Sequence, residues 1–132
     1  GYMSYNLATQ EFYQLCDRNL SKSGVIVVNI LKNNGFEAEY LKTIKTVFPH
    51  LYICNTSGGN TIIIGTRNRP IDKKEIREKA KSLQHSHQLS FPLVDRSNNL
   101  KVIEESSNFN LENVPILQDN ASPSNYFNSW LF

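Results

Sequence analysis

Few side chains in this sequence have the types and spacing that metal or nucleophilic chemistry requires. His85 and His87 alternate within a helical stretch, so they point to different faces of the helix, and no nearby Cys or further His completes a tetrahedral set. No Gly-x-Ser-x-Gly turn is present to expose a nucleophilic serine. We therefore expect surface histidines, no metal site and no hydrolase chemistry.

A basic run is the next candidate for function. Its cations are interleaved with two glutamates on one helix, and no aromatic side chains alternate with them for base stacking; they are Lys73, Lys74, Arg77, Lys79 and Lys81. The formal net charge of the chain is only +2. The pattern therefore favours a solvated helix face over a nucleic-acid interface.

The cysteines and the hydropathy bear on the compartment. Cys16 and Cys54 lie inside apolar segments, which favours buried, reduced thiols and a cytoplasmic location. No apolar run approaches the ~20 residues that span a bilayer, and no basic stretch followed by an apolar one opens the chain. We expect neither a membrane partner nor secretion.

The length and composition of the sequence bear on the number of domains. With 132 residues, 39% of them hydrophobic, the chain fits one domain.

The elements that must position any site begin with a helix and a strand. Apolar residues at Phe12, Leu15, Cys16 and Leu20 have helical spacing, and Thr9 can cap the helix. The run from Val25 to Ile30 is rich in β-branched residues and hardly alternates. Such a run is typical of a strand covered on both faces inside a parallel sheet.

A second helix and a hairpin follow. The helix extends from Phe36 to Phe48 and ends at Pro49, so strand, helix and strand form a right-handed crossover. Strands at 51–54 and 61–66 flank the turn at 57–60, which predicts an antiparallel hairpin. The predicted fold class is α/β: a parallel strand plus an antiparallel edge hairpin, with helices on both faces, as in the C-terminal part of a methyltransferase-like Rossmann sheet.

The remaining third of the chain has weaker signals. Asp72 can cap a helix that runs to about Leu83, with Glu75 returning a bond to the cap and Ile71 contacting Ile76. We expect short helices around 88–94, an extended piece at 100–103, and an apolar end at 126–132 that docks on the body or meets a partner. The predicted organisation is a lead at 1–6, the α/β unit at 7–84 and a loop-rich extension at 85–132.

Several segments, taken in order, resemble a known family. They are Leu7-Ala8-Thr9-Gln10-Glu11-Phe12-Tyr13, Leu20, Gly24-Val25-Ile26-Val27-Val28-Asn29, Val47-Phe48-Pro49, Gly59-Asn60-Thr61-Ile62-Ile63-Ile64 and Pro115-Ile116-Leu117-Gln118-Asp119-Asn120-Ala121-Ser122-Pro123. This ordered set is similar to the C-terminal half of the bacterial spermidine synthase-like proteins, which are polyamine aminopropyltransferases with a methyltransferase-type Rossmann fold.

The resemblance implies an activity for an intact family member. The donor there is decarboxylated S-adenosylmethionine, and a diamine such as putrescine accepts the aminopropyl group. The family keeps its glycine-rich cofactor loop, ribose-binding acid and catalytic aspartate in the half that precedes the helix near Thr9. This chain has no Gly-x-Gly-type turn after an N-terminal strand. We therefore expect no catalytic, cofactor-binding or metal-binding residues here, and no activity from these residues alone.

Two positions correspond to the substrate side of the family site. Asn29, at the end of the first strand, matches a polar amide near the substrate, and Asp119 is the acidic position of the closing motif. Each residue also has an ordinary structural interpretation, a strand-end amide and a turn-forming carboxylate. Thr56 stands where the synthases place a tyrosine.

The partner expectations follow from the half that the family places upstream. Strand 25–30 should expose unpaired backbone, so we expect it to pair with a missing N-terminal half or with another protomer, which includes self-association. Two other functions stay open: a non-catalytic binding or assembly module, and part of a methyltransferase-like enzyme that uses S-adenosylmethionine itself.

Overall fold

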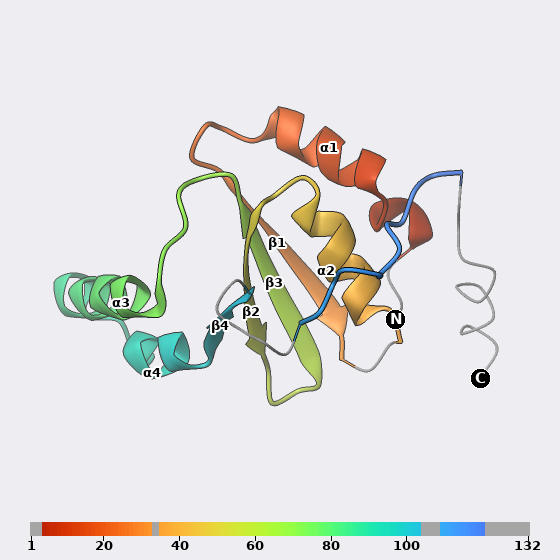
Figure 1. Cartoon of the computed structure of the whole chain (residues 1–132). Coiled ribbons are helices and arrows are strands. Elements are labelled where there is room, and N and C mark those ends of the chain that lie inside the picture. Colours follow the sequence, from red (N-terminus) through yellow and green to blue (C-terminus); the bar gives the residue numbers. More distant parts are fainter. Residues whose placement is uncertain (1–3, 33–34, 104–108, 121–132) are drawn as a thin grey trace.

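The computed structural model describes residues 4–32, 35–103 and 109–120. Helices and strands alternate along most of the chain, as Figure 1 shows. Their order is η1 (Tyr5–Leu7), α1 (Gln10–Asn19), β1 (Val25–Leu31), α2 (Glu37–Lys45), β2 (His50–Asn55), β3 (Asn60–Thr66), α3 (Lys73–His87), α4 (Leu93–Asn98) and β4 (Leu100–Val102).

Two helices begin at the predicted caps. The Thr9 hydroxyl accepts the Phe12 N–H at 3.3 Å, and the Asp72 carboxylate accepts the Glu75 N–H at 2.7 Å. Both bonds satisfy N–H groups that the first helical turn leaves without an intrahelical partner. Helix α3 continues past the predicted end at Leu83 to His87, and Gln88 follows with a left-handed φ of 47°.

The sheet has the strand order β1-β3-β2-β4, and each of its three ladders is antiparallel. The predicted hairpin is confirmed as β2 and β3, with Gly59 at a φ of 80° in the turn. Glycine suits this position because it adopts positive φ without steric cost. The segment predicted as extended at 100–103 forms β4, which pairs with β2.

The described strands form no parallel ladder, and the predicted place of the hairpin at the edge of the sheet is wrong. Strands β1 and β2 run in the same direction, since each is antiparallel to β3, but β3 lies between them. The hairpin strand is therefore central and not an edge. The physical reason is that β3 has two bonding edges: β2 satisfies one, and the crossover through α2 leaves room for β1 at the other.

The core lies between the sheet and helices α1 and α2, which share one side of it in Figure 1. Tyr13 of α1 is fully buried there, whereas Leu15 is 51% exposed, so the predicted apolar stripe of α1 is wrong at that position. Fully or almost fully buried side chains from α2, its C-terminal loop and the sheet complete this core: Tyr40, Leu41, Ile44, Phe48, Leu51, Ile53 and Ile63.

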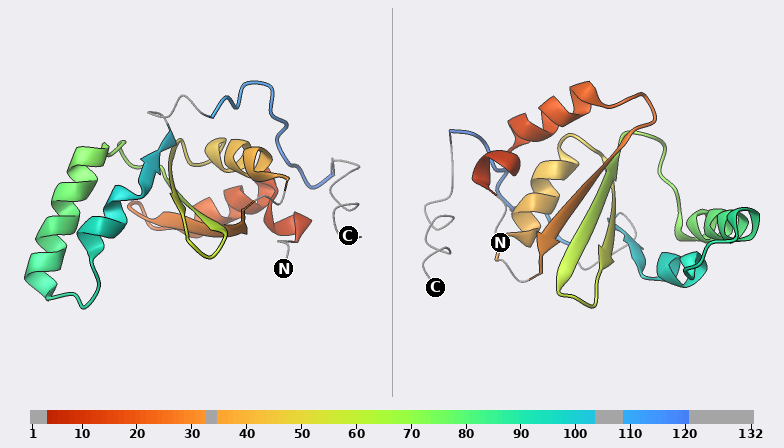
Figure 2. Two further views of the ribbon diagram at one scale, coloured as in Figure 1. Left: turned by 90° about the horizontal axis from the view of Figure 1, so that it is seen from below. Right: turned by 180° about the vertical axis from the view of Figure 1, so that it is seen from behind.

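The opposite face of the sheet is covered unevenly. Helices α3 and α4 lie beyond the β2–β4 side, and the right-hand view of Figure 2 looks onto β1 and β3 from that face. Val27 is 60% exposed and Val25 is 49% exposed. The expectation that this strand is covered on both faces is therefore wrong: Ile26, Val28 and Ile30 face the core, and the alternate residues are exposed.

The segment that follows β4 returns to the first helices. Leu117 is fully buried; its N–H donates to Thr43 Oγ1 at 2.9 Å, and its carbonyl accepts the Gln10 N–H at 2.8 Å. The Tyr5 hydroxyl donates to the carbonyl of Gln118 at 2.7 Å. Residues 115–119 thus join η1, α1 and α2. The predicted docking of 126–132 lies outside the described residues.

Candidate functional site

The free edge of β1 is the first candidate site. Lys32 donates its N–H to the Gly59 carbonyl at 2.8 Å, so Lys32 and every second residue before it direct their backbone groups toward β3. The alternate residues direct N–H and C=O groups away from the sheet; they are Val25, Val27, Asn29 and Leu31. An unpaired row of this kind is a template for another strand.

Exposed apolar side chains flank this edge on both faces. Val25, Val27 and Leu31 are exposed on the face away from α1, and Leu7, which precedes α1, is exposed on the other face. The register with β3 runs without a bulge from Val25 to Leu31, and no Pro, Lys or other charged residue interrupts the strand. Proteins usually protect free strand edges with bulges, prolines or charged residues. Because β1 has none of these, we expect another polypeptide segment to cover its edge.

A depression of about 380 Å³ lies along the same edge, between α1 and β1. Its lining residues include no carboxylate and no Lys or Arg; they are Leu7, Phe12, Tyr13, Cys16, Ile26, Val27, Val28 and Asn29. Partial burial raises the pKa of the Cys16 thiol, which keeps it protonated and a poor nucleophile. The depression therefore suits apolar side chains of an added element better than acid–base chemistry.

An ion pair fixes α1 over this edge. Arg67 follows β3 and reaches back to Asp17 of α1, with Nε–Oδ1 and Nη1–Oδ2 distances of 2.8 and 3.2 Å. Its Nη2 also donates to the carbonyl of Ser21. Of these two contacts, only the one from Nη1 to Oδ2 is a hydrogen bond; the contact of Nε with Oδ1 is an ion pair, and Oδ1 accepts no hydrogen bond from a described residue. The sequence gives no local signal for this pair, because the partners lie far apart along the chain.

Asn29 lies on β1 at the free edge, exposed and in the lining of the depression. Its side chain makes no hydrogen bond with a described residue. The structure thus places the predicted amide where an added strand or a ligand at the strand's carboxyl end can reach it. Its role in substrate binding stays a prediction.

Asp119 lies in the closing segment beside the start of α1. Its N–H donates to Glu11 Oε2 at 3.2 Å, and its side chain is exposed. The carboxylates of Asp119 and Glu11 therefore come from neighbouring segments, a pairing that sequence patterns do not predict. The structure does not join Asp119 to Asn29 by a hydrogen bond, so their shared role on the substrate side stays a prediction.

Other candidate positions have structural roles or none. Thr56 closes the hairpin, since its hydroxyl bonds to both the N–H and the carbonyl of Asn60 at 3.1 Å. Among the described residues, no group of three or more His, Cys, Asp and Glu side chains is arranged to hold a metal ion. No described helix combines the length and apolarity needed to cross a membrane.

Comparison with known proteins finds similarity at the level of structure. The chain resembles the crystal structure of a probable spermidine synthase from Corynebacterium glutamicum with a TM-score of 0.52 and 21% sequence identity, over 64% of this chain and 34% of that one. No protein-family model matches the sequence. No curated protein matches it either.

The structural similarity confirms the resemblance found in the sequence as a likeness of fold. The matched region spans about a third of the synthase chain, 34% of its length. The described residues of this chain form a mixed α/β arrangement, a four-stranded antiparallel sheet with flanking helices. The chain is therefore similar in fold to one part of a probable spermidine synthase, and the free edge of β1 is its candidate site.

Proposed function

We propose that this chain is the C-terminal part of a spermidine synthase-like protein. The intact protein would transfer an aminopropyl group from decarboxylated S-adenosylmethionine to a diamine such as putrescine. The observation that carries the proposal is the fold similarity to a probable spermidine synthase, together with a strand edge left ready for further sheet. The ordered sequence motifs support the same family.

The described residues do not fit the nucleotide part of such a cofactor. A nucleotide site on an α/β sheet needs a glycine-rich turn between a strand and a helix, where backbone amides approach the ligand. Gly58 and Gly59 lie instead in the hairpin between β2 and β3. Gly24 lies between a helix and a strand, α1 and β1, and a single glycine, Gly35, lies between β1 and α2.

The contribution of this chain would be on the amine side. A diamine attacks as a neutral amine, and the other end carries a positive charge that a carboxylate can hold. Asp119 offers an exposed carboxylate beside Glu11, and Asn29 offers an amide that can accept or donate a hydrogen bond. These two residues are our proposed substrate contacts.

The β1 edge would join this chain to the nucleotide-binding polypeptide. An added strand would pair with the outward backbone groups of β1, and its side chains on the α1 side would fill the depression lined by Leu7, Phe12 and Tyr13. The strand would come from an N-terminal half or from another protomer. Either source covers the exposed valines of the edge.

Enzyme assays test this proposal. The chain alone and the chain extended by its upstream coding sequence are incubated with putrescine and decarboxylated S-adenosylmethionine, and spermidine is measured by mass spectrometry. We expect product from the extended protein and none from the chain alone. Turnover by the chain alone, or no turnover by the extended protein, contradicts the proposal. Product formed only with ordinary S-adenosylmethionine favours the methyltransferase-like alternative.

A second candidate function is a non-catalytic binding or assembly module. The exposed, uninterrupted edge of β1 favours it, since strand addition alone can join two proteins. Titration calorimetry of the extended protein with both forms of the cofactor separates the candidates. Binding of neither form, with retained association through β1, supports the module.

A further inference from the structure

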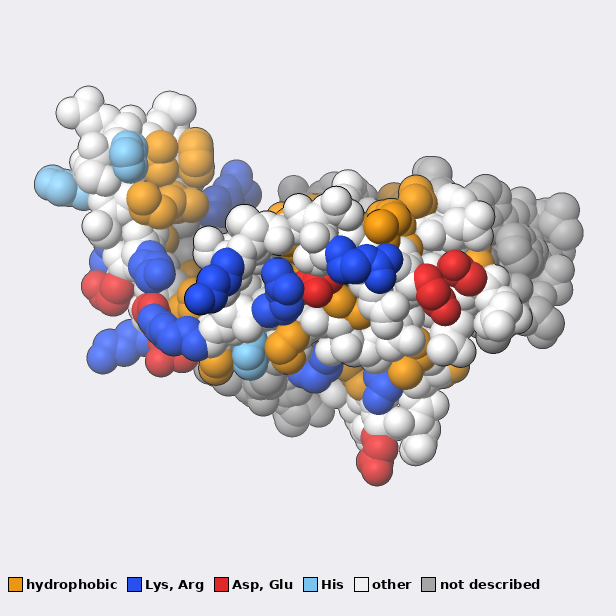
Figure 3. Space-filling view, turned by 90° about the horizontal axis from the view of Figure 1, so that it is seen from above, with side chains coloured by type: hydrophobic (Ala, Val, Ile, Leu, Met, Phe, Trp, Pro, Cys, Tyr) orange, Lys and Arg blue, Asp and Glu red, His pale blue; other side chains and the backbone are white. Residues whose placement is uncertain are grey.

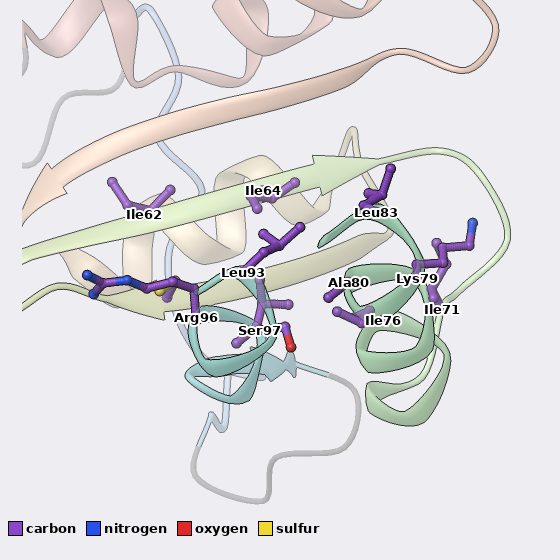
Figure 4. Close-up of a pocket in the computed structure, with 12 residues that line it drawn as sticks. Ile62, Ile64, Ile71, Ile76, Lys79, Ala80, Leu83, Leu93, Arg96 and Ser97 are labelled. Atoms are coloured by element: carbon purple, nitrogen blue, oxygen red, sulfur yellow. The ribbon is translucent and has the colours of Figure 1, made fainter. Parts of the chain in front are cut away.

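A second surface lies on the far side of the molecule from α1. Helices α3 and α4 and the outer face of the sheet enclose a groove of about 450 Å³ (Figure 4). Ile62 and Ile64 of β3 form one wall, and Ile76, Leu83 and Leu93 come from the helices. This volume is in the range of small-molecule sites, and sites of that kind are mostly apolar with few polar groups.

The groove continues toward β1. A neighbouring depression of about 230 Å³ shares Ile64, Ile71, Ile76 and Leu100 with it and extends to Val25 and Tyr52. The two together make an elongated apolar channel along the sheet. Such a shape fits an extended hydrocarbon chain better than a compact polar molecule.

The polar groups at the groove are basic. Lys79 and Arg96 are the charged side chains in its lining, and Figure 4 shows them at opposite ends of the row of apolar residues. The third polar residue, Ser97, already donates to the Val94 carbonyl at 2.6 Å. The lining contains no carboxylate, so the charge at the groove favours an anionic occupant.

The two cations differ in availability. Lys79 lies 3.8 Å from Glu75, whose carboxylate is also bound by Arg69. The guanidinium of Arg96 makes no ion pair or hydrogen bond with a described residue. The Arg96 guanidinium can therefore receive a planar carboxylate through two N–H donors.

The surrounding surface is consistent with an amphiphilic ligand. Figure 3 shows hydrophobic side chains exposed on the lobe that α3 and α4 form, with lysine and arginine side chains nearby. Leu83 and Phe91 are large hydrophobic residues exposed there. The cations on the solvent side of α3 disfavour a second copy of this helix as the occupant, because like charges would meet.

We propose that the groove between α3, α4 and the sheet binds a long-chain carboxylate, with the apolar chain along Ile62, Ile64 and Ile76 and the carboxylate at Arg96. This site is separate from the β1 edge and does not depend on aminopropyl transfer. The chemistry that it recognises is a single anionic head on a flexible hydrocarbon chain.

Titration calorimetry with dodecanoate, below the concentration of micelle formation, tests the proposal. We expect saturable binding, and about threefold to fourfold weaker binding for each methylene removed where the chain is fully buried. Dodecanol, which lacks the charge, should bind about two- to fivefold more weakly than dodecanoate. Dodecyltrimethylammonium, of opposite charge, should bind more weakly still.

Matched variants locate the ligand. Arg96→Gln should weaken dodecanoate binding about two- to fivefold and leave dodecanol unchanged, whereas Arg77→Gln on the outer side of α3 should change neither. Leu83→Ser should weaken binding of both ligands, and Leu15→Ser, an equally exposed leucine on α1, should not. These positions are exposed, so the variants should keep the unfolding midpoint.

Four results would overturn the proposal: no saturable binding of dodecanoate, equal binding of the cationic amphiphile, equal effects of Leu83→Ser and Leu15→Ser, or binding that only follows a doubling of the mass in light scattering. The last result would assign the surface to a second copy of the chain.

Discussion

Thr43 shows how one buried hydroxyl holds the closing segment in place. Its side chain is fully buried, and its Oγ1 accepts the Leu117 N–H at 2.9 Å. Thr43→Val keeps the shape but leaves that N–H unsatisfied, so we expect a loss of about 1–3 kcal/mol in the free energy of unfolding. Urea unfolding measures it. Thr46→Val, which removes a partly exposed hydroxyl, is the control and should cost less; equal losses would contradict this role.

Glu75 provides a pH-dependent contact between α3 and the loop before it. Hydrogen bonds from Arg69, helped by Lys79, hold the pKa of the Glu75 carboxyl below its ordinary value of 4.5. A lowered folded-state pKa stabilises the fold above pH 4.5, and this stability is lost as the pH falls through the lowered value. The predicted return bond to the Asp72 cap is replaced by this ion pair.

The pH dependence is measured against Glu75→Gln. We expect the wild-type chain to unfold at higher urea concentration than the variant above pH 4.5, and the two midpoints to converge as the pH falls below it. Glu112→Gln, at an exposed loop carboxylate that pairs with no described cation, should show no such convergence. A difference between wild type and Glu75→Gln that does not change with pH would refute the assignment.

At the scale of the elements, β3 depends on a glycine where it passes the core. A Cβ added to Gly65 would lie 3.0 Å from Ile26 Cγ2 and 3.0 Å from Phe48 Cβ, and Phe48 is fully buried. We expect Gly65→Ala to lower the free energy of unfolding by about 1–3 kcal/mol through overpacking. Gly58→Ala, with 3.9 Å to its nearest neighbour, should be nearly neutral in the same urea titration. A neutral Gly65→Ala would show that the core relaxes there.

The elements themselves could largely be predicted from the sequence, but their neighbours in the sheet could not. Caps at Thr9 and Asp72 and the hairpin turn at Gly59 are local signals, and each is confirmed. The position of β3 between β1 and β2 depends on contacts between segments that are distant in the sequence. The periodicity of hydrophobic residues predicts a strand but does not indicate which strands lie next to it. Tyr13 was missed as a core residue because its hydroxyl makes it look amphipathic.

For the candidate site, too, some features could be predicted from the sequence and others could not. The sequence identifies Asn29 and Asp119 through family motifs, and the structure places both near the first helices without a bond between them. The depression beside β1 and the groove under α3 were not predictable, since each is lined by residues from several elements. Exposure of Val25 and Val27 depends on which elements cover the outer face of the sheet, and that too is a property of the whole molecule.

For the molecule as a whole, the free edge of β1 predicts association of the chain by strand pairing. Val27 directs its N–H outward, whereas Val28 directs its N–H toward β3. Proline is tolerated on the outer side of an edge strand, so Val27→Pro should keep the circular dichroism spectrum and remove concentration-dependent association measured by light scattering. Val28→Pro should instead destabilise the fold by at least about 2 kcal/mol, because the β3 acceptor loses its donor. Association that survives Val27→Pro would show that another surface, and not the β1 edge, joins the chains.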